Sequence, residues 1–473
     1  MNKPLITRLQ MLVAFELDSL EKRLDQARSF HYPSAVAVKF IDSLIEELKQ
    51  QRLQIKQAIS DFLPEYPQRV TNELRSQHRL LINKLTCLDS LKNAQTQNVP
   101  WSLVPSIERI ASELSQGSQL LTTCTYALNY SIRWYPTPKS PIHQFSILQL
   151  PIIHKHNAFL HLLIGHELFH PLLQQFFVTQ TPSVVARLKA AISHLNQPPA
   201  KNRLDKLVEF VRYAWQRAIE ELMCDMGCAI LFGPAAVFAS IAFQMGSNLD
   251  EAPSSDGSFY PPPRYRIREV MHRVFGESVI GEAEQFHAGL EGTATTPIQK
   301  LAALLKEDER TSWAADILSE HRETILREIR KNDDLVPINQ NPLLKTAYEE
   351  VQAVLPDAWN YIRQIATSAG MVWLSTIDEV PFLLRSLELL VPPGEIRDTK
   401  APGQTKSPSL PSIAIATWLY QLKCEASVDA SLEQAMKSYS RCCRLMLKGF
   451  EDVELRREYD AGKDAFQQME QLP

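Results

Sequence analysis

Glycine is scarce in this sequence, which has 15 glycines among 473 residues. No two glycines have the Gly-x-Gly spacing, and the pair with phosphate-loop spacing, Gly276 and Gly281, is not followed by Lys and Ser or Thr. This argues against dinucleotide and nucleoside triphosphate chemistry. A strong excess of either charge is also missing, because 50 Lys and Arg oppose 54 Asp and Glu. This balance argues against a nucleic-acid-binding surface on the scale of the whole protein, so we expect no nucleic-acid partner.

The sequence is also poor in cysteine, and its N-terminus is poor in apolar runs. The seven cysteines are odd in number and scattered, and the N-terminus lacks an uninterrupted apolar stretch. These features suit a protein of the reducing cytoplasm that carries no secretory signal. The longest uncharged run, 226–243, has Gly233-Pro234 in its middle, so we predict a buried helix that breaks there. We therefore expect a cytoplasmic protein that does not span a membrane.

Helical periodicity dominates the sequence. Apolar residues recur at three- and four-residue spacing through 1–95, with breaks at 31–34 and 63–67, and the chain is mostly helical again from about 297. Shorter segments at 120–125, 128–134 and 145–150 favour strands, because turn-forming residues separate them. The predicted fold class is α+β, predominantly α. We expect a small antiparallel or mixed sheet packed on a zincin active-site helix, with helical regions at both ends.

The motif His-Glu-x-x-His stands at His166, Glu167 and His170. Positions four apart lie on one face of a helix, so the two histidines can bind one metal ion. Glu167 can act on a metal-activated water without being a ligand. The helix around the motif is apolar nearly all round, as expected of a buried helix, and burying these polar groups is costly without a partner such as a metal. Pro171 should end or kink the helix.

A hydrolytic zinc site needs a third protein ligand and an open fourth position. Glu221 and Asp225 lie four apart on a second predicted helix. Glu220 is interpreted as a solvated neighbour, and Cys224 as a small core residue. Arg264, Arg266, Arg268 and Arg273 form a basic cluster. It is interpreted as a solvated helix face, with contact to an acidic substrate or a ligand carboxylate as the alternative.

His-Glu-x-x-His followed by Glu-x-x-x-Asp resembles the pattern of the gluzincin zinc metallopeptidases. The resemblance implies that Glu221 is the third zinc ligand and that Asp225 orients His166 or His170. The interval from His170 to Glu221 is 51 positions, much longer than in the aminopeptidase branch of the group. The exopeptidase signature Gly-x-Met-Glu-Asn of that branch is absent.

A third fragment points to the same group. Residues 258–267 are similar to the Thr-His-Pro-Pro-x-x-x-Arg-Ile segment of CAAX-prenyl-protease-like peptidases. Tyr260 stands where that family has a histidine. We rank Tyr260 first as the residue that stabilises the oxyanion, with Tyr265 and His272 as alternatives. Those relatives are often integral-membrane proteins, whereas this chain lacks their spans.

These patterns divide the chain into three regions. An N-terminal helical region covers 1–95, and a zinc metallopeptidase domain covers 96–296. A C-terminal helical region covers 297–473 and contains a Pro-rich linker at about 391–411. The short sheet could present an edge strand to an extended peptide substrate.

The leading interpretation is a zinc-dependent endopeptidase in which Glu167 is the general base for a metal-activated water. Its large helical flanks suggest a regulated protease with few targets, and a regulatory protein partner could bind them. The main alternative is a helical interaction or scaffold protein whose zinc site is structural or inactive, closed by a fourth ligand such as a cysteine or His161. A zinc hydrolase acting on a substrate other than a peptide is the third interpretation.

Overall fold

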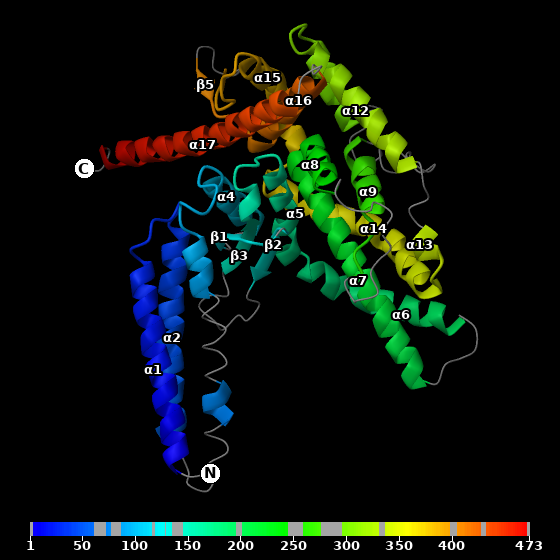
Figure 1. Ribbon diagram of the computed structural model, residues 1–473. Helices are drawn as coiled ribbons and strands as arrows, with labels where there is room; N and C mark the ends of the chain where they lie inside the picture. Colours follow the sequence, from blue (N-terminus) through cyan, green and yellow to red (C-terminus); the bar gives the residue numbers. More distant parts are fainter. Residues whose placement is uncertain are drawn as a thin grey trace. The chain divides into compact units, whose positions relative to one another are not determined.

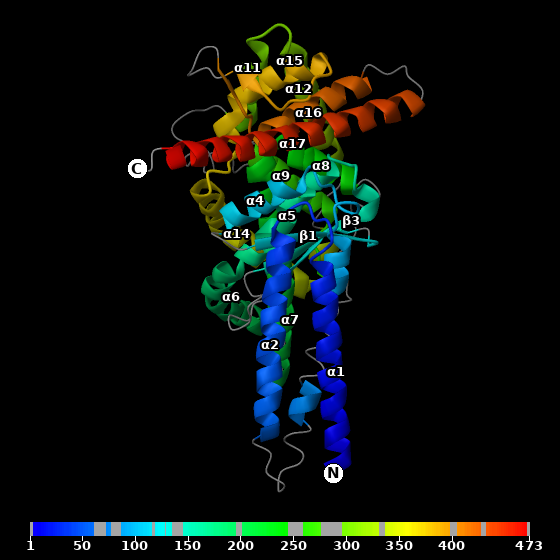
Figure 2. The same cartoon turned by 90° about the vertical axis from the view of Figure 1, so that its left-hand side faces the viewer.

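The computed structural model has two compact units, Met1–Lys155 and His156–Pro473 (Figures 1 and 2). This division groups the strands with the N-terminal helices. The division into three regions stays a prediction. The structure describes residues 3–60, 72–76, 87–115, 119–127, 129–134, 145–194, 201–244, 259–275, 296–330, 336–397, 404–426 and 432–470.

The first unit contains two long helices that lie side by side, α1 (Lys3–Ala27) and α2 (Val36–Ser60) (Figures 1 and 2). Their leucine stripes form a core that also takes in side chains of the sheet, and Phe40 meets Phe145 edge-on with ring centroids 5.2 Å apart. The helix break predicted at 31–34 is confirmed. The break predicted at 63–67 lies outside the described residues.

A mixed three-stranded sheet completes the first unit, together with helix α4 (Val104–Leu114) and the short 3₁₀ turn η1 (Ile152–His154). Strand β3 (Phe145–Pro151) is central: β1 (Gln119–Thr125) pairs with it in parallel, and β2 (Ser131–Trp134) pairs with it antiparallel. The predicted strands are therefore confirmed. The sheet belongs to the first unit and the His-Glu-x-x-His segment to the second, so their joint cleft stays a prediction.

The second unit is helical apart from a two-stranded ladder, which confirms the predicted α+β, predominantly α class. Its helices and 3₁₀ turns are η2 (Leu160–Leu163), α5 (Ile164–Phe169), η3 (His170–Leu172), α6 (Gln174–His194), α7 (Lys201–Phe232), α8 (Pro234–Gln244), α9 (Pro263–Phe275), α11 (Pro297–Lys306), α12 (Ser312–Arg330), α13 (Val336–Asn339), α14 (Pro342–Ser368), η4 (Trp373–Glu379), α15 (Val380–Glu388), α16 (Leu410–Ala426) and α17 (Leu432–Glu470).

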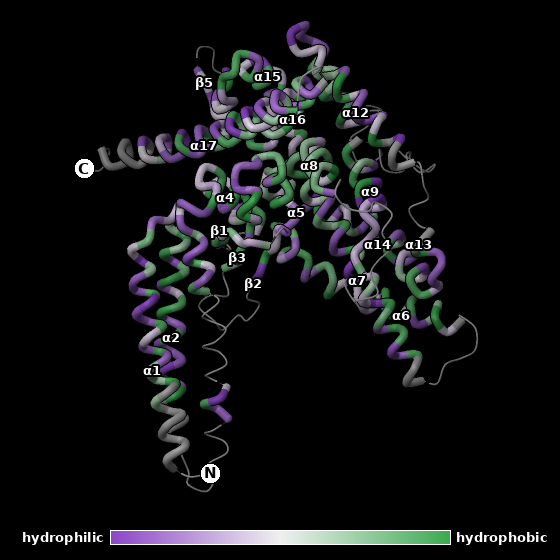
Figure 3. The backbone as a smooth tube through the Cα atoms, viewed as in Figure 1, coloured by the Kyte–Doolittle hydropathy of each residue, from purple (hydrophilic) through white to green (hydrophobic). Residues whose placement is uncertain are grey.

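The apolar run at 226–243 is the end of α7 followed by α8, as the sequence predicts. Gly233 separates the two helices with φ +55°, a left-handed conformation that suits glycine. The chain is buried from Met226 to Ala239, and hydrophobic colours follow α8 in Figure 3. In the described residues, no helix has both the length and the apolar character needed to cross a membrane.

The segment predicted as a Pro-rich linker at about 391–411 makes regular contacts in its described parts. Strands β4 (Ile396–Arg397) and β5 (Thr405–Lys406) pair antiparallel. The buried carboxylate of Glu379 accepts hydrogen bonds from the Lys406 ammonium at 3.0 Å and from the Ser409 backbone N–H at 2.7 Å. These contacts attach the segment to the turn η4, an effect that proline content alone does not reveal.

The His-Glu-x-x-His segment is less regular than the single helix predicted for it. Helix α5 has six residues between two 3₁₀ turns, and it ends at Phe169, just before Pro171. The predicted effect of this proline is confirmed, because a proline nitrogen has no hydrogen to donate to the preceding turn. The carbonyl of Glu167 instead accepts a hydrogen bond from the His170 backbone N–H.

Helix α5 packs directly on α7 because two glycines remove side chains from the contact. A β-carbon at Gly227 of α7 would lie 2.2 Å from the Phe169 ring. A β-carbon at Gly165 of α5 would lie 3.1 Å from the Cys228 sulfur. This close approach brings the histidines of one segment to the carboxylates of the other.

We predict that Gly227→Ala destabilises the protein, because the added methyl group forces the Phe169 ring or the whole α5 segment to move. Overpacking of this kind costs about 1–3 kcal/mol. Thermal unfolding followed by circular dichroism should show a lower Tm. Gly462→Ala on α17 is the matched control, since its new β-carbon meets nothing within 4 Å, and it should keep or slightly raise Tm. An unchanged Tm for Gly227→Ala would contradict the packing argument.

Candidate metal centre

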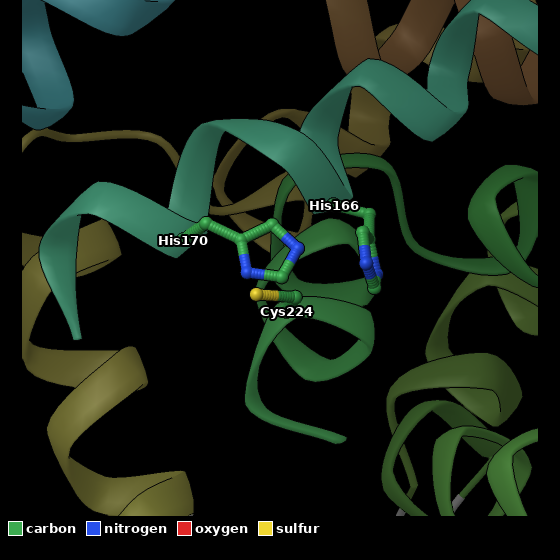
Figure 4. A group of neighbouring side chains, drawn as sticks. All are labelled: His166, His170 and Cys224. Atoms are coloured by element: carbon green, nitrogen blue, oxygen red, sulfur yellow. The ribbon is translucent and has the colours of Figure 1, made fainter. Parts of the chain in front are cut away.

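Two histidines and one cysteine meet at the contact between α5 and α7. His166 lies in α5 and His170 at the start of η3, and the backbone stays helical between them, so both rings share one face. Their centroids are 5.0 Å apart. Cys224 comes from α7 (Figure 4), and the ligand atoms of the three side chains lie within 4.8 Å of one another.

Each histidine is held by a carboxylate of α7 through Nδ1. His166 Nδ1 lies 2.8 Å from an Asp225 oxygen, and His170 Nδ1 lies 3.0 Å from a Glu220 oxygen. A carboxylate can only accept, so in the neutral ring Nδ1 donates and Nε2 keeps a free electron pair. This is how metal-binding histidines are usually oriented. The structure thus places Asp225 at the contact that the gluzincin resemblance implies.

The interpretation of Glu220 as a solvated neighbour is wrong. Its side chain is 14% exposed and also accepts a hydrogen bond from Arg217. Although burial raises the pKa of Glu220, His170 and Arg217 lower it below its ordinary value. A signal was available in the sequence: two histidine ligands need two orienting partners, and Asp225 could serve only one.

Glu221 is almost fully buried, with 3% of its surface exposed. Its Oε2 atom lies 3.3 Å from His166 Nε2. Two ligand atoms that lie about 2.0–2.2 Å from one tetrahedral ion are about 3.3–3.6 Å apart. The spacing of these two atoms therefore fits a shared metal ion.

The interpretation of Arg266 as part of a solvated helix face is also wrong. Its guanidinium donates two hydrogen bonds to Asp225, at 2.7 and 2.9 Å, and lies 3.3 Å from Glu221. Burial opposes ionisation of Asp225, but Arg266 and His166 hold the pKa of this carboxyl well below its usual range. Arg266 thus keeps the Asp225 carboxylate charged where it contacts His166 Nδ1.

The site is dense in negative charge. Burial lowers the pKa of His166, but Asp225 and Glu221 outweigh it and raise that pKa to about 10. Burial raises the pKa of Glu221, but His166 and Arg266 lower it to about 2. In the metal-free protein, the proton on His166 therefore balances part of the negative charge of the Asp225 and Glu221 carboxylates. A bound cation could balance that charge instead.

A count of the charged groups leads to the same conclusion. Four carboxylates and two guanidiniums contact or flank the cluster: Glu167, Glu220, Glu221, Asp225, Arg217 and Arg266. With both imidazoles neutral, two negative charges remain. A buried cluster of this kind is stable only if the charge is balanced, and one divalent cation balances it.

Glu167 differs from the other carboxylates. It is half-buried on α5, and its carboxylate makes no hydrogen bond or ion pair with the described residues. Its charge nevertheless acts on the Cys224 thiol, whose pKa is raised well above its ordinary value by burial and by the surrounding carboxylates. The motif thus leaves one unengaged carboxylate close to the metal-binding group.

Tyr260 lies at the edge of the centre and is 46% exposed. The Arg217 guanidinium stands over its ring, 5.1 Å from the centroid. The preceding Phe259 has φ +47° and is buried against Phe210, with ring centroids 5.1 Å apart. Because Phe259 is buried and has a left-handed backbone conformation, it fixes the backbone position from which the Tyr260 side chain extends.

Tyr265 does not fit the alternative role in oxyanion stabilisation. It is fully buried, and its hydroxyl oxygen accepts a hydrogen bond from Gln352. A group that stabilises an oxyanion must reach the space next to the reacting bond. Tyr260, half-exposed beside Arg217, meets this condition better than Tyr265.

Comparisons with protein-family models, with curated proteins and with solved structures found no match to this chain.

The two orienting contacts predict the effect of removing either carboxylate. Asp225→Ala and Glu220→Ala should each weaken Zn²⁺ binding on the order of 10- to 100-fold, because the ring that each carboxylate holds becomes free to rotate. Competition with a chromophoric chelator measures this affinity. Glu209→Ala, an exposed position on the same helix, is the control and should bind like wild type. Wild-type affinity in Glu220→Ala would restore the interpretation of Glu220 as a solvated neighbour.

Proposed function

We propose that this protein is a zinc-dependent endopeptidase whose metal is held by His166, His170 and Glu221. The observation that carries the proposal is the paired orientation of the two rings. Each Nδ1 atom faces its own carboxylate, and His166 Nε2 lies 3.3 Å from the Glu221 carboxylate. The gluzincin-like order of the motifs supports the assignment.

The bound zinc would act as a Lewis acid and lower the pKa of a water molecule. Glu167 is the general base: it takes a proton from the attacking water and returns it to the leaving amine. Asp225 and Glu220 hold the two imidazoles in place. Tyr260 would donate its hydroxyl hydrogen to the developing oxyanion.

The substrate we propose is a protein or peptide that binds in extended form. The helical regions on both sides suggest few targets and a regulatory protein partner. The free cysteines support a cytoplasmic location.

The second candidate function is a helical scaffold with a closed, structural zinc site. One observation favours it: the Cys224 sulfur lies in the same group as the two histidines. With Glu221 and Cys224 both bound, four protein ligands would leave no position for water. His161, the other residue considered for this role, is buried on η2 and is outside that group.

The balance of charge favours the site with three protein ligands and an open fourth position for water. The carboxylates and guanidiniums already leave two negative charges for a divalent ion. A Cys224 thiolate would add a third charge inside a buried cluster, at a considerable desolvation cost. A neutral thiol packed beside the metal avoids that cost.

The zinc content of variants distinguishes a site held by His166, His170 and Glu221 from a site that includes Cys224 as a ligand. We predict about one zinc per chain for wild type and for Cys224→Ala, and loss of most zinc for Glu221→Ala. Elemental analysis of purified variants measures this content, with circular dichroism to confirm folding. Retention of zinc in Glu221→Ala together with its loss in Cys224→Ala would show that Cys224 is the third ligand. Loss of zinc in both variants would indicate the closed site.

Glu167→Gln tests for catalysis. The change keeps nearly the same volume and all three ligands, so the variant should stay folded and zinc-loaded. Proton transfer typically contributes 10²–10⁴-fold to the rate, so cleavage should fall by about that factor. The assay is mapping of new N-termini in a cell lysate treated with each protein, followed by kinetics on a cleaved peptide.

Glu209→Gln is the matched control and should cleave like wild type. If zinc-loaded wild type produces no new N-termini, or if Glu167→Gln cleaves as fast as wild type, the peptidase proposal fails.

A further inference from the structure

A separate cavity of about 470 Å³ lies in the second unit. Its walls come from α7, α9, α11, α14 and η4. It is open to solvent, because Lys300, Thr367 and Gly370 in its wall are exposed. A space of this size falls in the range of small-molecule sites, about 300–1,000 Å³.

The wall of the cavity is mostly apolar and includes two tryptophans. Trp359 of α14 and Trp373 of η4 stand with Ile230, Val274 and Pro297 around the space. Trp373 is held in position because it packs against Gly233, where a β-carbon would lie 2.6 Å from the indole. Aromatic walls with a few polar groups are typical of sites that bind a small organic molecule.

Both charged side chains among the described residues of the wall are basic. Lys300 of α11 and Arg363 of α14 both contribute to the cavity, and Arg363 also lines a shallower hollow beside it. Two hydroxyls, from Thr367 and Ser375, lie in the same wall. None of the described residues that line the cavity is acidic. These groups suit a carboxylate, because guanidinium and ammonium groups donate strong hydrogen bonds to it.

We propose that this cavity binds a small amphipathic carboxylate, with its apolar body between the tryptophans and its carboxylate at Lys300 and Arg363. The site is distinct from the metal centre but uses the same helix. Asp225 and Ala229 are one turn apart on α7, which is about 6 Å along the axis, and Ala229 lines the cavity. The proposal does not depend on peptidase activity.

The probe is 8-anilinonaphthalene-1-sulfonate, an aromatic anion whose fluorescence rises in apolar surroundings. Decanoate should displace it from the full-length protein, with half-maximal effect on the order of 10–100 μM, below the concentration at which decanoate forms micelles. Decanol has the same chain without the charge and should displace it at least about tenfold less well, because charge-assisted hydrogen bonds are lost.

Three variants locate the binding. The double variant Lys300→Gln/Arg363→Gln should weaken decanoate displacement about tenfold or more and leave decanol unchanged. Thr367→Trp should reduce the binding of both by filling the space. Lys345→Gln, an exposed position on the same helix, is the control.

Equal displacement by decanoate and decanol, or an unaffected double variant, would show a merely apolar surface and overturn the proposal. A wild type that binds neither compound would overturn it as well. The double variant should keep its full zinc content, so failure here is distinct from failure of the metal centre.

Discussion

The closeness of α5 to α7 is the constraint on which the candidate centre depends. The two helices meet where Gly227 leaves room for the ring of Phe169, the residue directly before His170. If this distance grew by the width of a methyl group, the contacts between imidazole and carboxylate, now 2.8 and 3.0 Å long, would be broken. A packing feature with no chemistry of its own therefore sets the geometry of every polar group in the site.

Electrostatics depends on the same contact. Buried carboxylates are tolerated on α7 because Arg217, four residues before Glu221, and Arg266, from α9, lie against them. The two arginines leave a residual negative charge, which raises the pKa of His166 to about 10 in the absence of a metal. Without a metal, this excess of buried negative charge destabilises the protein, and a divalent cation would neutralise it. Such an arrangement is expected when binding, and not folding alone, has shaped the local sequence.

Much of this could be predicted from the sequence, and what could not has a physical reason. Residue spacing brought His166 and His170 to one side of the chain, because i and i+4 share a helix face. The contact between Asp225 and a histidine was an expectation from the gluzincin resemblance, since the two segments are far apart in the sequence. Residue spacing failed for Glu220 and Arg266, since the buried side of a long helix is decided by every element packed on it, here η3 and α9 as well as α5. The apolar pattern located the strands. The parallel pairing of β1 with β3 depends on contacts distant in sequence, which periodicity does not contain.

Cys224 shows why the chemistry of a site follows from the whole charge distribution and not from proximity alone. By distance, its sulfur belongs with the two histidines, and a thiolate is a good zinc ligand. By charge, the thiol stands among carboxylates that oppose its ionisation. Glu167 adds to that opposition and yet has no hydrogen-bond partner within the described residues. In a closed structural site this carboxylate would only add repulsion. In the open site that we propose, this carboxylate would be placed to accept a proton, so the same residue that disfavours Cys224 as a ligand would act as the general base.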